Sequence, residues 1–134
     1  MSSIEQEVRE WPGVTIREHD RGGREFTLDE RELGHIHGES LLDIPFTKRI
    51  RTILVSEGRA EKHHVVPDSG WVSYRIDDDE DSTGAIWLLR LSYCYHVLAT
   101  ADETWKERID IEAELDSLEP SDELRNVFEA IGDI

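Results

Sequence analysis

The sequence predicts an α+β protein, with a mainly antiparallel sheet of four or five strands and helices packed on one face of it. Short segments with alternating apolar residues fill 14–46 and 71–76, which is the pattern of half-buried strands. The segment 82–101 is apolar nearly all round and predicts a helix that lies across the sheet. We expect an α+β domain at 1–100 and an acidic helical tail at 101–134, packed on the same domain or on a partner.

The chain begins with a short helix and a strand. Residues 3–11 carry apolar side chains at helical spacing, and the Pro-Gly pair that follows ends the predicted helix. A strand over 14–20 alternates at Val14 and Ile16, and the turn at 20–23 reverses the chain.

The first predicted hairpin turns at Asp29-Glu30. This two-residue turn pairs Leu28 with Arg31. Further along the same ladder, it pairs Phe26 with Leu33. The apolar residues of the two strands then share one face of the sheet.

The second hairpin decides where two histidines point. A two-residue turn at Gly38-Glu39 pairs His35 with Leu42, and strand alternation then places His35 and His37 on the apolar face. A three-residue turn instead puts Asp43 beside His35 and permits a His–His–Asp cluster. Apolar matching favours the first register, with Asp43 on the opposite face. The apolar face then carries Phe26, Leu28, Leu33, Leu42, Ile44 and Phe46.

A capped helix, a loop and a strand follow. Thr47 caps the predicted helix and Gly58 stops it. The segment 61–70 predicts a loop or an edge strand, interrupted by Pro67. The strand at 71–76 leads, through an acidic loop, into the long helix. In the tail we expect one acidic helix over 103–118 and another that opens at Pro120-Ser121.

The charge excludes some partners. The chain of 134 residues has a net charge of −16, and residues 77–134 hold 17 acids against 4 bases. Repulsion therefore disfavours nucleic acid and anionic membranes as partners. Only three of the 15 basic residues are lysines, which is what we expect of a halophilic protein in a salt-rich cytoplasm.

Other features bound the location and the chemistry. The N-terminus is acidic and amphipathic, so we expect neither a secretory signal nor a transit peptide. The single cysteine, Cys94, excludes an internal disulfide, predicts a small buried side chain and makes a reducing cytoplasm the default location. The sequence lacks a GxGxxG loop, a Walker P-loop and a GxSxG elbow, so it gives no support to dinucleotide, P-loop or α/β-hydrolase chemistry.

Several motifs occur in the order of a known family. They are "WPGV" at 11–14, "ERELGHIHGESLLDIPF" at 30–46, "HHVVPDSGWVSYRI" at 63–76 and "WLLRLSY" at 87–93. Together they resemble the luciferase-domain family, small and mostly uncharacterised proteins similar to fungal luciferase, over about 4–98. The resemblance implies oxygen-dependent chemistry on a small aromatic compound, without a flavin.

The candidate site residues are three histidines and three residues of the segment that follows His64. His35, His37 and His64 are candidate catalytic residues, because a histidine can act as acid or base near neutral pH. Asp68, Ser69 and Trp71 are candidate binding residues at the rim of a pocket. Paired imidazoles can also chelate a metal, with His63 or His64 as a third ligand. The favoured register points Asp43 away, so we assign no metal ligand and no cofactor.

Two functions remain compatible with the sequence. The first is a small-molecule-binding domain, with or without oxygen-dependent enzyme activity, whose pocket lies between the sheet and the long helix. The second is a non-enzymatic interaction module whose acidic tail faces a partner, for example a second copy in a homodimer. A large cavity lined by histidines favours the first function. A filled core with exposed apolar residues on the helices of 103–131 favours the second.

Overall fold

The computed structural model describes residues 3–18, 23–38, 40–78, 80–100 and 103–132. Outside these ranges lie the last two residues of the predicted first strand (His19 and Asp20), the turn residues Arg21 and Gly22, Glu39 of the predicted second turn, and residues 101–102 at the start of the predicted tail. The elements are α1 (Ser3–Arg9), β1 (Val14–Glu18), β2 (Arg24–Leu28), β3 (Arg31–His37), β4 (Leu41–Pro45), α2 (Lys48–Ser56), β5 (Glu61–Lys62), β6 (Trp71–Arg75), α3 (Asp81–Ala99), α4 (Glu103–Arg108), α5 (Ile111–Leu118) and α6 (Asp122–Gly132).

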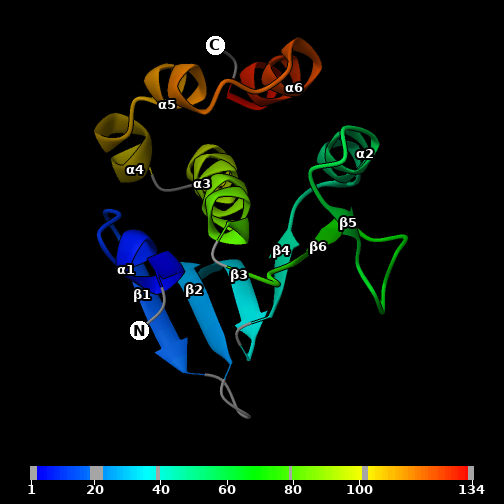
Figure 1. Cartoon of the computed structure of the whole chain (residues 1–134). Helices are drawn as coiled ribbons and strands as arrows, with labels where there is room; N and C mark the ends of the chain where they lie inside the picture. The colour runs from blue at the N-terminus through cyan, green and yellow to red at the C-terminus, as the bar shows by residue number, and fades with distance from the viewer. Residues whose placement is uncertain (1–2, 19–22, 39, 79, 101–102, 133–134) are drawn as a thin grey trace.

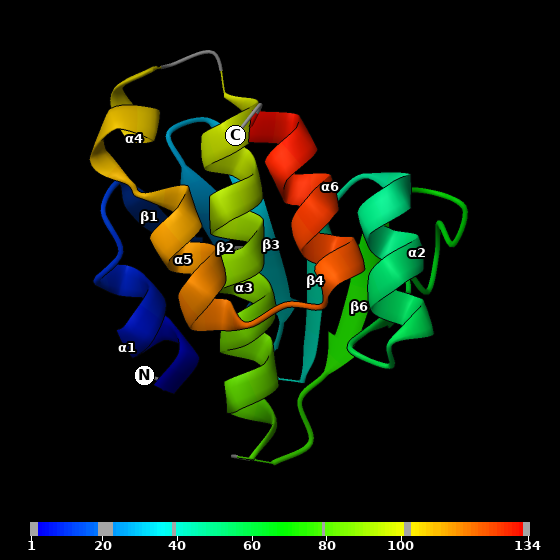
Figure 2. The same cartoon turned by 90° about the horizontal axis from the view of Figure 1, so that it is seen from above.

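The expected α+β class is confirmed. The strands form one six-stranded antiparallel sheet in the order β1-β2-β3-β4-β6-β5. The helices lie on one side of it (Figure 1), with α3 running across the sheet and α5 and α6 packed over α3 (Figure 2). Among the described residues, none of the helices combines the length and the apolarity needed to cross a membrane.

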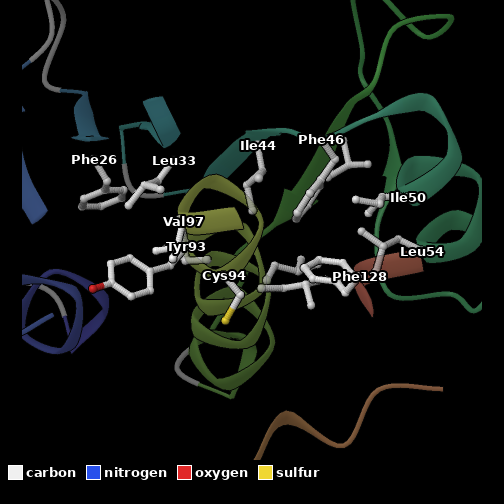
Figure 3. Packing of buried hydrophobic residues seen from close by; sticks show 14 of the residues in the cluster. Phe26, Leu33, Ile44, Phe46, Ile50, Leu54, Tyr93, Cys94, Val97 and Phe128 are labelled. Carbon is white, nitrogen blue, oxygen red and sulfur yellow. The ribbon is translucent and has the colours of Figure 1, made fainter. Parts of the chain in front are cut away.

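The core lies between the sheet and α3 (Figure 3). Phe26 and Leu33 from the strands pack on the α3 side that carries Tyr93 and Val97, and all four are fully buried. Polar groups of α3 also reach the elements around it. The Ser92 hydroxyl donates a hydrogen bond to the Leu33 carbonyl at 2.7 Å, which fixes α3 against β3.

The tail departs from the prediction in one respect. The expected helix over 103–118 is two helices, because the Asp110 carboxylate caps α5 by accepting a bond from the Ala113 N–H at 3.1 Å. The helices of the tail contribute buried side chains to the same core, including Leu115 and Phe128. At the start of α6, the Ser121 hydroxyl donates to the Glu57 carboxylate at the end of α2, at 2.5 Å.

The first hairpin contains a β-bulge that the sequence analysis missed. Leu28 pairs with Arg31 as predicted, but Phe26 pairs with Gly34 rather than with Leu33. Leu33 is therefore an extra residue in β3, and Leu33 and Gly34 both face the helices. A side chain at Gly34 would lie 3.2 Å from the Leu89 side chain of α3 and 3.0 Å from the Asp43 carbonyl oxygen. The bulge reverses the alternation of every later residue in β3.

The favoured register of the second hairpin was also wrong. His35 pairs with Asp43 and His37 pairs with Leu41, so the turn holds three residues rather than two. Strand alternation in the favoured register would place Ile36 on the face opposite His35 and the core, but Ile36 is buried in the core at 5% exposure. His35 and His37 instead point to the face of the sheet opposite the helices, which we call the outer face. The predicted pocket between these histidines and the long helix therefore does not form.

Candidate functional site

The site is built around a carboxylate on the outer face. Asp43 stands in β4 between His35 of β3 and Ser73 of β6, its direct partners across the ladder. Its exposure is 0%, although no helix of the described chain covers this face. The Ser73 hydroxyl donates a hydrogen bond to Asp43 Oδ1 at 2.5 Å.

Four imidazoles surround the other oxygen of this carboxylate. From Asp43 Oδ2, the Nε2 atoms lie at 2.8 Å for His37 and 3.3 Å for His64. Those of His63 and His35 lie at 3.4 and 3.6 Å. We call these five residues the histidine–aspartate cluster. Its rings cover the carboxylate and explain why a charged group on an otherwise open face is buried.

A second carboxylate orients His35. Glu32 Oε2 lies 2.6 Å from His35 Nδ1, on the side of the ring away from Asp43. Hydrogen bonds to Asp43 and Glu32 raise the pKa of His35 to about 9, although burial acts in the other direction. Burial also pushes the pKa of Asp43 upward, but hydrogen bonds from His35, Ser73 and His64 outweigh it and hold the pKa below its usual range. The cluster therefore holds a stable anion at its centre.

The edge of the sheet brings the second pair of histidines to the first. The short strand β5 pairs Glu61 with Ser73 and Lys62 with Val72, so the chain leaves β5 beside Asp43. The rings of His63 and His64 stack at 4.4 Å between centroids.

The loop after these histidines is fixed by contacts at its base. The Arg51 guanidinium of α2 donates hydrogen bonds to the carbonyls of Pro67 and Ser69, at 3.0 and 2.7 Å. Gly70 lies so close to the Phe46 carbonyl that any side chain there would collide with it. The loop therefore returns along a defined path to β6, and the histidines before it keep their positions.

The structure brings together the four histidines that the sequence singled out. His35, His37 and His64 meet at Asp43, and the Trp71 ring lies 5.5 Å from that of His35 between centroids. Asp68 is exposed on the loop. The Ser69 hydroxyl shapes the loop, donating to the Val66 carbonyl at 2.7 Å and accepting from the Trp71 N–H at 3.1 Å.

Sequence reasoning assigned no role to Asp43, Ser73 or Glu32. The hypothesis of a three-residue turn contained the Asp43 contact, but apolar matching outweighed it. Glu32 and Ser73 gave weaker signals. Glu32 precedes His35 by three residues, and Ser73 shares a strand face with Trp71. These positions become informative only once the strand faces are known.

The donor atoms have the spacing of a metal site. A divalent ion with ligands at about 2.1 Å holds neighbouring donors roughly 3–3.4 Å apart. His35 Nε2 and His37 Nε2 lie 3.0 Å apart, and their distances to Asp43 Oδ2 are 3.6 and 2.8 Å. Within the part of the chain that the structure describes, two trios have all donor atoms within 4.8 Å of one another, namely His35, His37 and Asp43, and Asp43, His63 and His64.

The fold and the site define a small α+β protein with the histidine–aspartate cluster on the outer face of its sheet. Residues 30–92 match the family model of the Luciferase domain, the same family that the sequence motifs resemble. The matched segment contains all five members of the cluster. No curated protein and no solved structure matches the chain significantly.

Proposed function

We propose that the protein binds one divalent transition-metal ion through His35, His37 and Asp43. The observation that carries the proposal is the convergence of four imidazole Nε2 atoms on one oxygen of a buried carboxylate. A carboxylate oxygen accepts about two good hydrogen bonds, so four nitrogens around it are more than hydrogen bonding needs. A cation between Asp43 Oδ2 and the Nε2 atoms of His35 and His37 would satisfy these three groups and leave fewer donors around the oxygen.

The neighbouring carboxylate supports the same proposal. A histidine that binds a metal through Nε2 commonly donates its Nδ1 proton to a carboxylate, which fixes the ring and raises its basicity. Glu32 stands in this position for His35, at 2.6 Å from Nδ1. In the metal-bound protein, His35 would present its Nε2 lone pair to the ion. Its Nδ1 would keep its proton and donate it in a hydrogen bond to Glu32.

The donor set fits a limited choice of metals. Two histidines and one carboxylate on one side of an ion, with the other positions open, are typical of non-haem Fe(II) oxygenases. Three ligands of these types also serve Zn²⁺ in catalytic sites. The cluster is lined by sheet residues and by one loop, so the open positions face away from the helices.

An oxygen-dependent reaction on a small aromatic compound is the activity that agrees best with both the donor set and the chemistry that the luciferase-domain resemblance implies. An Fe(II) centre supplies oxygen chemistry without a flavin, and dioxygenation places both oxygen atoms in the substrate, so that no further reductant is consumed. Trp71 is placed beside His35 and His63 and offers an aromatic wall to such a compound.

The alternative function, an interaction module with an acidic tail, has less support. Among the described residues, the exposed large apolar side chains are Val65 and Val66, and both lie on the loop beside the cluster rather than on the tail helices. The apolar residues of the tail, such as Leu124 and Phe128, are buried in the core of the same chain.

Metal binding is tested by titration of the chelator-treated protein. We expect calorimetry with Zn²⁺, and with Fe²⁺ under anaerobic conditions, to give one ion per chain. His35→Ala and His37→Ala should lose this binding, whereas Asp68→Asn, which removes an exposed carboxylate from the neighbouring loop, should retain it. Equal binding by the two histidine variants and the parent protein would rule out this site.

Oxygen chemistry is tested separately on the Fe²⁺-loaded protein. Catechol is a suitable probe, because its two oxygens can occupy adjacent open positions on an ion. We expect catechol-dependent oxygen uptake by the parent protein and none by His37→Ala. A loaded protein that binds catechol without consuming oxygen would leave a metal-dependent binding protein as the function.

A further inference from the structure

The two stacked histidines at the edge of the cluster are not equivalent, although they are adjacent in the sequence. Their Nε2 atoms lie at nearly the same distance from Asp43 Oδ2, 3.4 Å for His63 and 3.3 Å for His64. By distance alone, either could bind the ion that we place at His35, His37 and Asp43. The difference between them lies on the opposite edge of the His63 ring.

Two backbone N–H groups donate hydrogen bonds to the second ring nitrogen of His63, Nδ1. The N–H groups of Val65 and Val66 both point at His63 Nδ1, at 3.1 and 3.2 Å. A nitrogen that accepts two N–H donors carries its lone pair there and no proton. The single proton of the neutral ring is therefore on Nε2, the nitrogen that faces the cluster.

A protonated Nε2 cannot bind a metal, because the lone pair that would form the bond is absent. We infer that His63 is not a metal ligand but a hydrogen-bond donor, which points its Nε2–H at Asp43 and at any small anion bound to the ion. This inference rests on the proposed metal site and assigns a role within it. His35 has the reverse arrangement, since its Nδ1 faces Glu32 and its Nε2 faces the cluster.

The burial of the two rings agrees with this division. The side chain of His63 is 12% exposed and that of His64 is 44% exposed. His63 also contacts the Trp71 ring, at 5.9 Å between centroids. The donor is therefore held between the loop backbone and an aromatic wall, so it stays aimed at the site. The ligand class that this geometry selects is a small anionic group with an acceptor atom beside the metal.

Azide and Co²⁺ provide the test, because the visible bands of protein-bound Co²⁺ report both the loading of the site and the binding of azide. We expect His63→Ala to bind Co²⁺ within about threefold of the parent affinity. It should bind azide at least about tenfold more weakly, which is the loss expected for one hydrogen bond to a charged group. His63→Gln, whose amide can donate from a similar position, should recover part of the azide affinity. Val65→Ala removes an exposed side chain but keeps the backbone donor, so it should behave like the parent.

Nitrogen-15 NMR of the Zn²⁺-loaded protein should show His63 as the neutral tautomer with the proton on Nε2. Loss of Co²⁺ binding in His63→Ala, or an unchanged azide affinity, would overturn the inference. So would a His63 ring that is protonated on Nδ1. Failure of the parent protein to bind Co²⁺ is a different result, visible before any variant is made, and it would overturn the proposed metal site together with this role.

Discussion

Asp43 is the residue on which the cluster depends most, and Asp43→Asn is the most informative single change. The substitution keeps the shape of the side chain and an oxygen that can accept the Ser73 hydrogen bond, but removes the negative charge. Asp43 Oδ2 belongs to both candidate ligand trios, so no other residue of the cluster substitutes for it. Metal binding should therefore be strongly weakened in the variant while the fold is retained.

The size of the effect follows from linkage between binding and folding. At a free-metal concentration of 100 times the Kd, binding stabilises the folded state by about 2.7 kcal/mol. For a chain of 134 residues, unfolding entropy scales so that 1 kcal/mol shifts the Tm by roughly 3.5 °C. The parent protein should therefore gain about 10 °C on adding metal. If the lost charge weakens binding about 100-fold, only about 0.4 kcal/mol and roughly 1.5 °C remain.

The assay is thermal unfolding of the chelator-treated protein with and without Zn²⁺, compared within each variant. This comparison cancels any stability that the substitution costs in the absence of metal. Asp68→Asn is the matched control, because it makes the same chemical change at an exposed position of the neighbouring loop, and it should show the full shift. A metal-induced shift in Asp43→Asn as large as that of the parent would refute the reasoning.

Three further predictions concern residues outside the cluster. Gly70→Ala should destabilise the protein by about 3 kcal/mol or more in urea unfolding, because the new methyl group collides with the Phe46 carbonyl; a loss below about 1 kcal/mol would show that the loop can move aside. Cys94 is buried, and burial raises the pKa of its thiol to about 12, so it should react with a disulfide reagent only after unfolding; fast reaction of the native protein would contradict this. Burial and the adjacent Arg31 lower the pKa of His96 to about 4. The contribution of the neutral His96 ring to the free energy of unfolding is therefore complete above pH 6.5 and is lost as the pH falls towards 4. The free energy of unfolding should fall over this range by up to about 3 kcal/mol more in the parent than in His96→Gln, and equal pH slopes would exclude the effect.

Much of the fold was readable because it depends on local patterns. The cap at Thr47 is observed, with its hydroxyl accepting from the Ile50 N–H at 3.2 Å, and Gly58 follows the helix with a φ of 75°. The long helix was predicted from its apolar composition, and it occupies Asp81–Ala99. These features involve residues a few positions apart, so the sequence contains nearly all the information that they need.

The order of the strands and the path of the loop between β5 and β6 could be known only from the tertiary structure. β6 pairs with β4 across an intervening helix and loop, and only this pairing places Ser73 beside Asp43. The Arg51 bonds that fix the loop also join residues 16 and 18 positions apart. No local spacing rule connects such residues.

The sequence by itself determined the class of the fold, most of the apolar residues of the core and the histidines that form the candidate site. Only the tertiary structure decided which face those histidines occupy. The physical reason is the bulge at Leu33, where two consecutive residues turn towards the helices. Strand alternation carries a single irregularity to every residue that follows, so one extra residue moved His35 and His37 out of the core and onto the face that holds Asp43.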